Sequence, residues 1–469
     1  MAIDRPNVLF IAVDDLRPNL GCYGDRVAIS PHLDALAAEG VLFDRAYCQQ
    51  AVCNPSRASV MTGLRPDTIR VWDLKTHFRS TLPDVVTLPQ QFKAHGYHTQ
   101  CVGKIYHDPK TAQDPVSWSV PETLAVTGAC HGKYVLPENI AVYRQRGKAA
   151  ATECVDVPDT AYIDGRVAES AVAILNTIYQ QPFFLAVGFR RPHLPFSAPK
   201  KYWDLYRRDE IPLPENPFRP ADCPDIALHQ WLELRGYTDI PDVGPLDEMK
   251  ARELIHGYYA AMSYTDAQIG KVLKHLDTLG LSENTVVVLW GDHGWHLGEH
   301  DLWGKTTNFE LDTRVPLMVK APWMPQRGII RHELVEFVDI YPTLCDLCGI
   351  DQPANLEGIS LRPLLEATAD ESPVWKDAAF SQFPRYPGAP GQRKDAPDID
   401  VMGYSMRVDR YRYTAWIERT SGRTVAAELY DYRTDPGETV NIVGRPEHAQ
   451  LVRTLAEKLE AGWRGALPD

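Results

Sequence analysis

The sequence has no long hydrophobic run. Its first apolar segment, Val8–Val13, ends after six residues at Asp14 and Asp15. Six residues are too few for a signal-peptide core or for a helix that crosses a membrane. We therefore expect no membrane partner and, for the chain as written, a cytoplasmic location. A periplasmic or secreted location is expected if a signal peptide has been removed.

Cysteine is also scarce. Nine cysteines in 469 residues are too few for a disulfide scaffold. Cys345 and Cys348 have C-x-x-C spacing, but the sequence has no second such pair to complete a zinc site. Ile340, Leu344 and Ile350 around them indicate the flank of a helix. We therefore expect both cysteines to be small buried hydrophobic side chains, without a metal or redox role.

Positive charge is in deficit. Lys and Arg number 49 against 62 Asp and Glu, which gives a net charge of −13. A nucleic-acid-binding protein is expected to carry a broad basic face, so nucleic acid is not an expected partner. A few cations in a cleft still suffice to bind an anionic substrate locally.

Short apolar runs alternate with amphipathic segments along most of the chain. Val8–Val13 is apolar throughout, as expected of a strand that is buried on both faces. Helices are predicted over residues 31–39, with Ser30 as the N-cap, and over about 248–279. Further strands are predicted at Thr99–Val102, Pro182–Phe189, Thr285–Trp290 and Leu317–Val319. The fold class is therefore α/β, with a large, mixed, mainly parallel sheet sandwiched by helices.

The pattern changes near residue 370. The predicted strands beyond it are Ala378–Phe383, Gly403–Val408, Tyr411–Ile417 and Ala427–Tyr432, and a closing helix runs from about Glu447 to Trp463. A chain of 469 residues exceeds the usual size of one domain. We predict a main domain over residues 1–372 and a smaller C-terminal α+β subdomain, with a small antiparallel sheet, over residues 373–469.

Three of the predicted strands are followed by polar clusters. These are Asp14-Asp15, Arg190-Arg191-Pro192-His193 and Gly291-Asp292-His293-Gly294. In parallel α/β sheets, ligands bind beyond the carboxyl ends of the strands, so we expect the three clusters to meet at one site. The proline-rich stretch over residues 192–245 lacks periodicity and is predicted to be an insertion near that site.

The carboxylates of these clusters suggest a metal. Asp14, Asp15 and Asp292 offer hard oxygen ligands, which favour calcium or magnesium. One such aspartate is equally consistent with a helix cap or a turn, but three together favour a metal. His296 and His300 have the i, i+4 spacing of zinc ligands. Their segment is not H-E-x-x-H and contains a glycine that weakens a helix, so zinc is the less favoured alternative.

Cys53 begins the segment Cys53-Asn54-Pro55-Ser56-Arg57. Pro55 and the helix-tolerant residues after it predict that Cys53 lies at a helix N-terminus, where the helix dipole and Arg57 stabilise negative charge. From the residues alone, Cys53 is a candidate thiolate nucleophile with a nearby histidine base. A buried structural cysteine is the alternative.

This segment is the C-x-P-S-R signature that the chain shares with the type I sulfatases, a family of alkaline-phosphatase-like hydrolases. The chain resembles that family in four further motifs, in the expected order: Asp14-Asp15, Val102-Gly103-Lys104, His193 and Gly291-Asp292-His293-Gly294. It most resembles the iduronate-2-sulfatase branch, over nearly the whole chain. The resemblance lapses over about residues 108–160 and 199–247.

The resemblance implies a role for each motif. A separate maturing enzyme would oxidise Cys53 to formylglycine, whose hydrate attacks the sulfate and later expels it. Calcium would be held by Asp14, Asp15, Asp292 and His293 together with an oxygen of residue 53, and would polarise the sulfate. The groups that would orient the hydrate, bind the sulfate oxygens and protonate the leaving alcohol are Arg57, Lys104, His107, His193 and Lys305.

The function implied is hydrolysis of a sulfate ester on a sulfated sugar, with a 2-O-sulfate on a uronic acid as the expected substrate. One alternative is a phosphate or phosphonate ester hydrolase of the same superfamily. Another is a catalytically silent carbohydrate-binding relative, against which the intact set of Cys53, Arg57, Asp292 and Lys305 argues.

Overall fold

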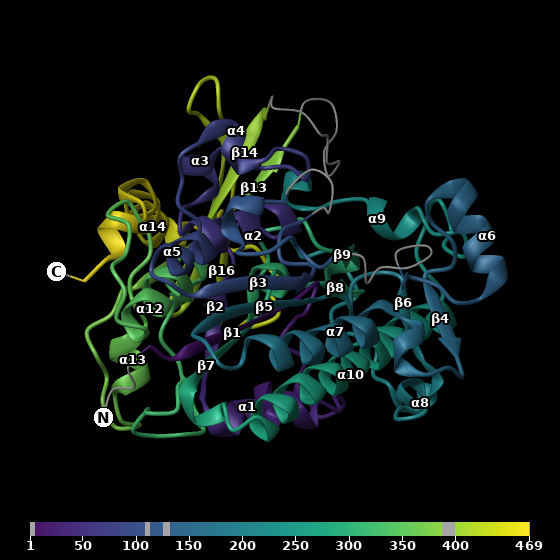
Figure 1. Cartoon of the computed structure of the whole chain (residues 1–469). Helices are drawn as coiled ribbons and strands as arrows, with labels where there is room; N and C mark the ends of the chain where they lie inside the picture. The colour runs from purple at the N-terminus through teal and green to yellow at the C-terminus, as the bar shows by residue number, and fades with distance from the viewer. Residues whose placement is uncertain (1–4, 108–112, 125–131, 387–398, 469) are drawn as a thin grey trace.

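The computed structural model describes residues 5–107, 113–124, 132–386 and 399–468. At its centre is an eight-stranded sheet in the order β11-β2-β10-β7-β1-β5-β3, with β12 also paired to β2 (Figure 1). Its strands are β1 (Asn7–Val13), β2 (Val41–Tyr47), β3 (His98–Gly103), β5 (Phe183–Phe189), β7 (Thr285–Gly291), β10 (Arg314–Lys320), β11 (Ile329–Arg331) and β12 (Val335–Glu336).

The sheet is mixed but mainly parallel. β1 pairs in parallel with β5 and β7, and β3 pairs in parallel with β5. β10 runs antiparallel to both of its neighbours, β7 and β2. The predicted fold class is therefore confirmed. Four of the five predicted strands of the sheet lie within an observed one, and the fifth, Pro182–Phe189, begins one residue before β5.

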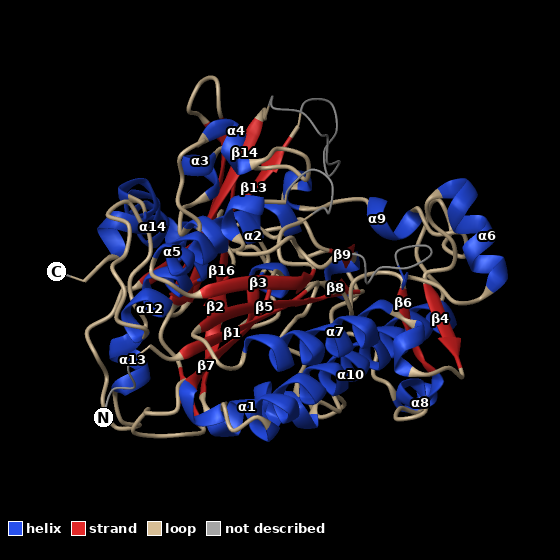
Figure 2. Cartoon of the chain, viewed as in Figure 1, coloured by secondary structure: helices blue, strands red, loops and turns tan. Residues whose placement is uncertain are grey.

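Helices cover both faces of the sheet (Figure 2). Along β1, Leu9, Ile11 and Val13 belong to one hydrophobic core, and the alternate residues Val8 and Phe10 belong to the other. This alternation follows from the two-residue period of a strand. The helices that contribute to the first core include α1 (Pro31–Glu39), α7 (Ile163–Ile178) and α10 (Glu248–Thr278), and those of the second include α2 (Cys53–Thr62), α5 (Leu88–Ala94) and α12 (Ile340–Leu347).

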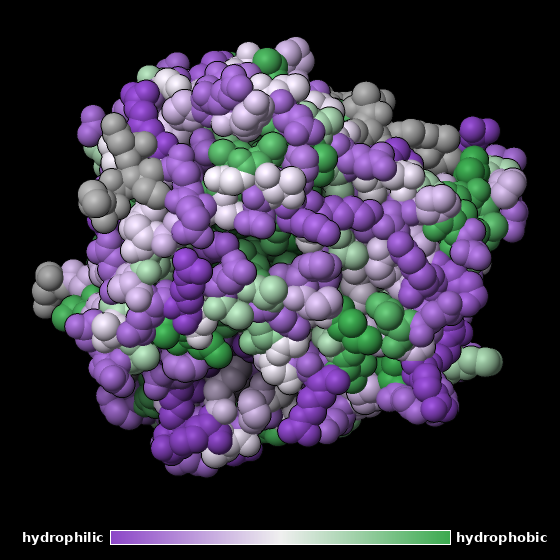
Figure 3. All heavy atoms as spheres, turned by 60° about the horizontal axis from the view of Figure 1, so that its bottom comes forward, coloured by the Kyte–Doolittle hydropathy of each residue, from purple (hydrophilic) through white to green (hydrophobic). Residues whose placement is uncertain are grey.

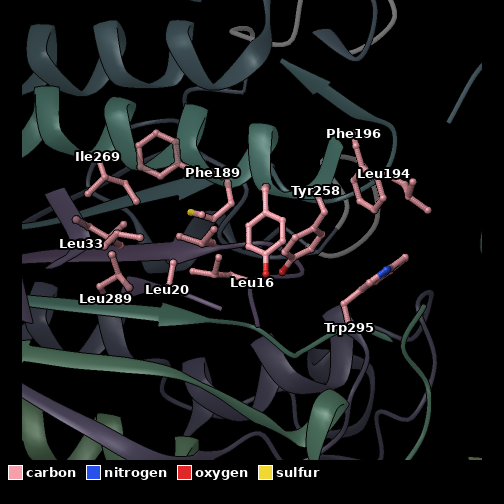
Figure 4. Close-up of a cluster of buried hydrophobic side chains, with 14 of the residues drawn as sticks. Leu16, Leu20, Leu33, Phe189, Leu194, Phe196, Tyr258, Ile269, Leu289 and Trp295 are labelled. Carbon is pink, nitrogen blue, oxygen red and sulfur yellow. The ribbon is translucent and has the colours of Figure 1, made fainter. Parts of the chain in front are cut away.

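The first core ties α1 and α10 to the sheet. Figure 4 shows Leu33, Tyr258 and Ile269 among the buried side chains gathered between the helices and the strands. Ser30 is at the N-cap position of α1, as predicted, but its side chain makes no capping hydrogen bond. Asp266 of α10 caps the helix instead, because its Oδ1 accepts from the backbone N–H groups of His32 and Leu33 at 3.1 and 2.8 Å.

The C-terminal part contains a four-stranded antiparallel sheet in the order β13-β14-β15-β16. The strands are β13 (Ala378–Arg385), β14 (Val401–Val408), β15 (Tyr411–Glu418) and β16 (Thr424–Asp431), and α14 (Ala449–Ala461) follows them. Leu455 of α14 packs in one hydrophobic cluster with Met406 and Tyr413 of the sheet. The smaller antiparallel sheet is therefore confirmed, whereas the domain boundary at residue 372 stays a prediction.

Shorter elements complete the chain. They are β4 (Thr152–Val155), β6 (Phe196–Pro199), β8 (His296–Leu297), β9 (Trp303–Gly304), α3 (Pro66–Ile69), α4 (Phe78–Thr81), α6 (Pro137–Arg146), α8 (Lys200–Trp203), α9 (Leu232–Arg235), α11 (Glu310–Thr313) and α13 (Arg362–Glu366). On the face shown in Figure 3, hydrophobic residues form separate patches within a mostly hydrophilic surface.

None of the described helices has the length and apolar content needed to cross a membrane.

Candidate active site

The predicted clusters meet because the strands that carry them end at the same level. In the sheet register, Val13 of β1 lies beside Phe189 of β5 and Gly291 of β7. The backbone N–H of Asp14 donates to the Phe189 carbonyl, and that of Asp292 donates to the Val13 carbonyl. The polar residues that follow each strand therefore emerge together at the carboxyl edge of the sheet, as predicted.

β3 brings Lys104 to the same edge. The backbone N–H of Lys104 donates to the carbonyl of Gly188 at 2.9 Å. Gly103 has a φ of +78°, and a Cβ atom there would lie 2.1 Å from the Gly188 carbonyl oxygen. Only glycine allows this close approach at a positive φ, so Gly103 fixes the position from which Lys104 reaches Asp14.

Cys53 is the first residue of α2, and all ten residues of this helix are buried. Cys53 itself is 1% exposed. Its Sγ atom lies 3.2 Å from His293 Nε2, 3.4 Å from Asp14 Oδ1 and 3.7 Å from Lys305 Nζ. The prediction that Cys53 stands at a helix N-terminus is confirmed, and the sulfur lies at the centre of the polar cluster.

Each of the three aspartates is paired with a cation. Lys104 Nζ lies 2.5 Å from Asp14 Oδ2, and Lys305 Nζ lies 2.8 Å from Asp15 Oδ1. Arg57 Nε donates to Asp292 Oδ2 at 2.8 Å. These residues are buried, with exposures of 5% or less. Lys104 and Lys305 are therefore not the surface lysines that composition alone would favour.

The pairing decides how the carboxylates ionise. Burial alone would raise the pKa of Asp14, but Lys104, His193 and Arg57 outweigh it and hold that pKa well below its usual value. Burial raises the pKa of Asp15 well above its usual value, with Asp14 adding to the effect and Lys305 opposing it. Asp14 is thus a stable anion, whereas Asp15 has too little compensating positive charge.

The donor set fits a hard metal cation. Ligand atoms of Asp14, Cys53, Asp292 and His293 all lie within 4.8 Å of one another, and Asp15 belongs to a second such group with Asp14 and Cys53. Asp15 Oδ2 is buried and has no hydrogen-bond partner within the described residues. Clustered carboxylates with one orphaned oxygen are what an oxygen-preferring divalent cation would satisfy.

In both His293 and His193, Nδ1 lies next to a backbone carbonyl oxygen, so Nε2 is on the opposite side of the ring. His293 Nδ1 lies 3.0 Å from the Gly294 carbonyl oxygen, and His193 Nδ1 lies 2.7 Å from that of Leu194. A ring nitrogen next to a carbonyl oxygen carries a proton, so Nε2 is the nitrogen through which each ring acts on the site. Burial, with Lys305 nearby, lowers the pKa of His193 well below its usual value.

A cavity of about 330 Å³ opens beside Lys305. Its lining comprises Lys148, His229, Trp231, Leu232, Glu233, Trp303, Gly304, Lys305 and Thr306. Four of these residues belong to or precede α9, within the proline-rich stretch over residues 192–245. The prediction that this stretch lies near the site is therefore correct. Sequence reasoning missed Glu233, whose carboxylate approaches both His193 and Lys305.

The remaining predicted residues have other surroundings. His107 lies two residues beyond Ile105, whose carbonyl accepts from Arg57, and it is in neither group of candidate metal ligands. His296 Nδ1 binds Asp312, its Nε2 meets His300 Nδ1 at 3.1 Å, and His300 Nε2 meets the Gly437 carbonyl. With both ring nitrogens of each histidine engaged, this pair has a structural role, not that of zinc ligands.

Cys345 and Cys348 lie at the end of α12 in the second hydrophobic core. Burial raises the pKa of each thiol to about 12. They are therefore packed as hydrophobic side chains, as predicted.

The fold places this site in a known class of protein. The chain has the fold of the alkaline-phosphatase-like hydrolases, and it is similar to the solved phosphonate monoester hydrolase of Silicibacter pomeroyi. That comparison gives a TM-score of 0.76 at 24% sequence identity, over 99% of this chain and 96% of the other.

Sequence comparisons identify the family within that class. Residues 6–350 match the sulfatase family model, and residues 298–464 match the model described as N-sulphoglucosamine sulphohydrolase, C-terminal. Mouse iduronate 2-sulfatase is 35% identical over 97% of this chain and 94% of its own length. The human enzyme is 33% identical over 96% and 94%. The chain belongs to the sulfatase family and is a sulfuric ester hydrolase.

Proposed function

We propose that this sulfatase removes a 2-O-sulfate from a uronic acid of a sulfated glycan, with a formylglycine derived from Cys53 and one bound calcium ion. The buried cluster centred on Cys53 Sγ carries the proposal for the site, because three charged or titratable groups approach that atom within 3.7 Å. The similarity to two iduronate 2-sulfatases over nearly the full chain supports the choice of substrate.

The proposed calcium ligands are Asp14, Asp15, Asp292, His293 and an oxygen on residue 53. Bound there, calcium supplies a Lewis acid that polarises the sulfate group. Asp15 supports this assignment most directly, because its orphaned Oδ2 atom lies in a buried, carboxylate-rich cluster. His293 departs from calcium's preference for oxygen, and its Nε2 also lies 3.2 Å from the Cys53 sulfur.

Cys53 is the proposed formylglycine position, and the hydrated aldehyde supplies a nucleophilic hydroxyl with a route for sulfate release that a thiol lacks. Burial and Asp14 act to raise the pKa of Cys53, but the net pKa is lowered, because Lys104 and Lys305, together with Arg57 and His293, favour the thiolate. The surroundings of residue 53 therefore stabilise negative charge on its side chain. A maturing enzyme would be the partner that performs the conversion.

The other polar side chains have separate tasks. Arg57 holds Asp292 and the carbonyls of Lys104 and Ile105, so it fixes the metal ligands relative to β3. Lys305 would bind a sulfate oxygen. His193 would act on the leaving alcohol through Nε2, since its Nδ1 atom is engaged with the Leu194 carbonyl, and Asp14 and Glu233 favour the imidazolium that protonation of the alcohol requires.

Lys104 and His107 complete the proposed set. Lys104, through its ion pair with Asp14, would keep the attacking oxygen next to positive charge. His107, at the end of the same segment, would help to orient the hydrate.

The cavity beside Lys305 is the proposed sugar pocket. It combines the cations Lys148 and Lys305 with the ring of Trp303. A sulfated uronate carries two anionic groups and an apolar ring face, so it matches this combination. Contacts with the sugar would hold the ester in position for attack, which is how binding energy is converted into rate.

The proposal is tested with a panel of matched esters. We expect kcat/KM for a 2-O-sulfated uronate at a chain end to exceed that for an aryl sulfate, for other sulfated sugars and for the corresponding phosphate esters. Peptide mass spectrometry across residue 53 should show the aldehyde in the active preparation. Full activity with only the thiol present would refute the formylglycine. Release from other sulfated sugars with none from any 2-O-sulfated uronate would refute the substrate.

A further inference from the structure

Glu233 lies where an anionic substrate would be expected. It belongs to α9, in the stretch where the resemblance to iduronate 2-sulfatases lapses. Its Oε1 atom lies 3.3 Å from His193 Nε2, and its Oε2 atom lies 3.4 Å from Lys305 Nζ. The carboxylate therefore bridges the two side chains that are proposed to act on the sulfate ester.

The backbone around Glu233 is anchored independently of this bridge. Lys148 Nζ donates to the Glu233 carbonyl oxygen, and Trp231 Nε1 donates to the Asp301 carbonyl at 2.7 Å. The Glu233 side chain itself is 27% exposed and borders the cavity of about 330 Å³. A rotation of the side chain alone can thus remove the carboxylate from its bridging position while α9 stays in place.

We propose that Glu233 is a specificity-determining residue whose carboxylate occupies the sulfate position between His193 and Lys305 until a sulfate ester displaces it. A carboxylate and a sulfate present similar oxygens to the same two side chains, and their like charges exclude simultaneous occupation. The inference rests on the proposed roles of Lys305, which would bind a sulfate oxygen, and of His193, which would act on the ester oxygen of the leaving alcohol.

Displacement favours a large substrate over a small anion. Inorganic sulfate offers only its charge and must remove the carboxylate from two partners, so it binds weakly. A sulfated sugar makes further contacts in the cavity, and its hydroxyl groups can donate to the displaced Glu233 carboxylate. Glu233 thereby disfavours retention of the free sulfate product and raises the preference for a glycan over an aryl sulfate.

The test is equilibrium binding of inorganic sulfate, measured by calorimetry on the full chain in calcium-containing buffer. We expect Glu233→Gln to bind sulfate about tenfold more tightly than the unchanged protein. At an effective dielectric constant of about 20, a unit charge about 4 Å from an anion repels it by more than the free energy of a tenfold change in affinity, before solvent screening reduces the repulsion. Glu215→Gln, at an exposed position in the same stretch, is the matched control and should leave the affinity for sulfate unchanged.

Two further variants keep the result interpretable. Glu233→Asp retains the charge, but its side chain is too short to bridge both partners. Its affinity for sulfate should therefore lie between those of the unchanged protein and Glu233→Gln. Lys305→Ala should weaken sulfate binding. If Glu233→Gln, with an unchanged melting temperature, binds sulfate no more tightly than Glu215→Gln, the inference is overturned.

The variants also separate this inference from the proposed function. Unchanged sulfate binding in Lys305→Ala would overturn the sulfate-binding role of Lys305 and this inference with it. Because inorganic sulfate contains no sugar, neither result decides which glycan is the substrate. Conversely, failure of the uronate proposal in the ester panel would leave the sulfate-binding result intact.

Discussion

Lys305 and Asp15 form an ion pair of 2.8 Å between Nζ and Oδ1, and both side chains are almost completely buried. The pair joins the second residue after β1 to a residue 290 positions further along the chain. Burying two charges costs free energy that their attraction repays only in a favourable geometry, and removing one partner leaves the other uncompensated. This contact therefore links the chemistry of the site to the stability of the fold.

Lys305→Ala should lower kcat/KM on any sulfate ester by about 10²–10³-fold, the usual effect of removing one group that stabilises charge in the transition state. The variant should also melt at a lower temperature than the unchanged protein, because Asp15 loses its cation. Kinetics and thermal unfolding measure the two effects. Lys274→Ala, at an exposed position on α10, is the control for loss of a lysine and should match the unchanged protein in both.

Asp292→Asn should impair metal binding and leave Arg57 with a weaker partner, because Arg57 Nε donates to the Asp292 carboxylate in a fully buried contact. For the unchanged protein, calcium at about 100 times its dissociation constant should add about 2.7 kcal/mol of stability. The melting temperature should therefore rise with calcium in the unchanged protein and rise less in the variant. Zinc at full occupancy in elemental analysis, or equal calcium-dependent shifts, would contradict the calcium assignment.

The sequence predicted the site well because its elements are local. Asp14-Asp15 and Asp292-His293 directly follow apolar strands, and parallel strands end at a common edge. Cys53 precedes a helix-tolerant segment, and the observed helix begins at that residue. In each case a few consecutive residues are enough to predict where the polar side chain lies on its strand or helix. The parallel topology then brings these side chains together.

What the sequence did not reveal depends on contacts between distant segments. Asp266 caps α1 from more than 230 positions away, so the local pattern pointed to Ser30 instead. Glu233 lies on a helix of only four residues, which is too short for any periodic signal. Its importance follows only from its distances to His193 and Lys305, which depend on how the stretch over residues 192–245 folds back onto the site.

Cys53 should resist alkylation in the folded protein although its pKa is lowered. Thiolate character favours reaction, but Cys53 is 1% exposed at the start of a fully buried helix, so access decides the rate. Brief treatment of unconverted protein with iodoacetamide, followed by peptide mass mapping, should label the exposed Cys154 and not Cys53. Labelling of both after denaturation is the control.

The burial of Cys53 also limits the access of a maturing enzyme to this residue. A folded chain cannot present Cys53 to an active site, so conversion should occur before folding is complete. Incubation of folded, unconverted protein with a maturing enzyme should yield no aldehyde, whereas the unfolded chain or a peptide spanning Cys53 should be converted. Equal conversion of folded and unfolded protein would show that the α2 region opens readily.

Asp266 makes a pH-dependent contribution to stability that is separate from the site. Burial raises its pKa from 3.8 to about 7, although the backbone N–H groups of Leu33 and His32 oppose the shift. Because the pKa in the folded state lies above that in the unfolded state, the folded protein binds more protons between these two values. The stability contributed by this group is therefore fully present below about pH 4 and is lost as the pH rises through about 7.

Asp266→Asn separates the cap from the charge, because the amide keeps an Oδ1 acceptor for the N-terminus of α1 and cannot ionise. We expect its melting temperature to exceed that of the unchanged protein at pH 8, and the difference to shrink as the pH falls to 5. Asp266→Ala also removes the ionisable group but loses the cap, so it should be about 1 kcal/mol less stable than the Asn variant at both pH values. Scanning calorimetry at matched ionic strength measures all three proteins. A difference between Asp266→Asn and the unchanged protein that does not vary with pH would show that Asp266 does not titrate in this range, and its hydrogen bonds to α1 would then be those of a permanently charged cap.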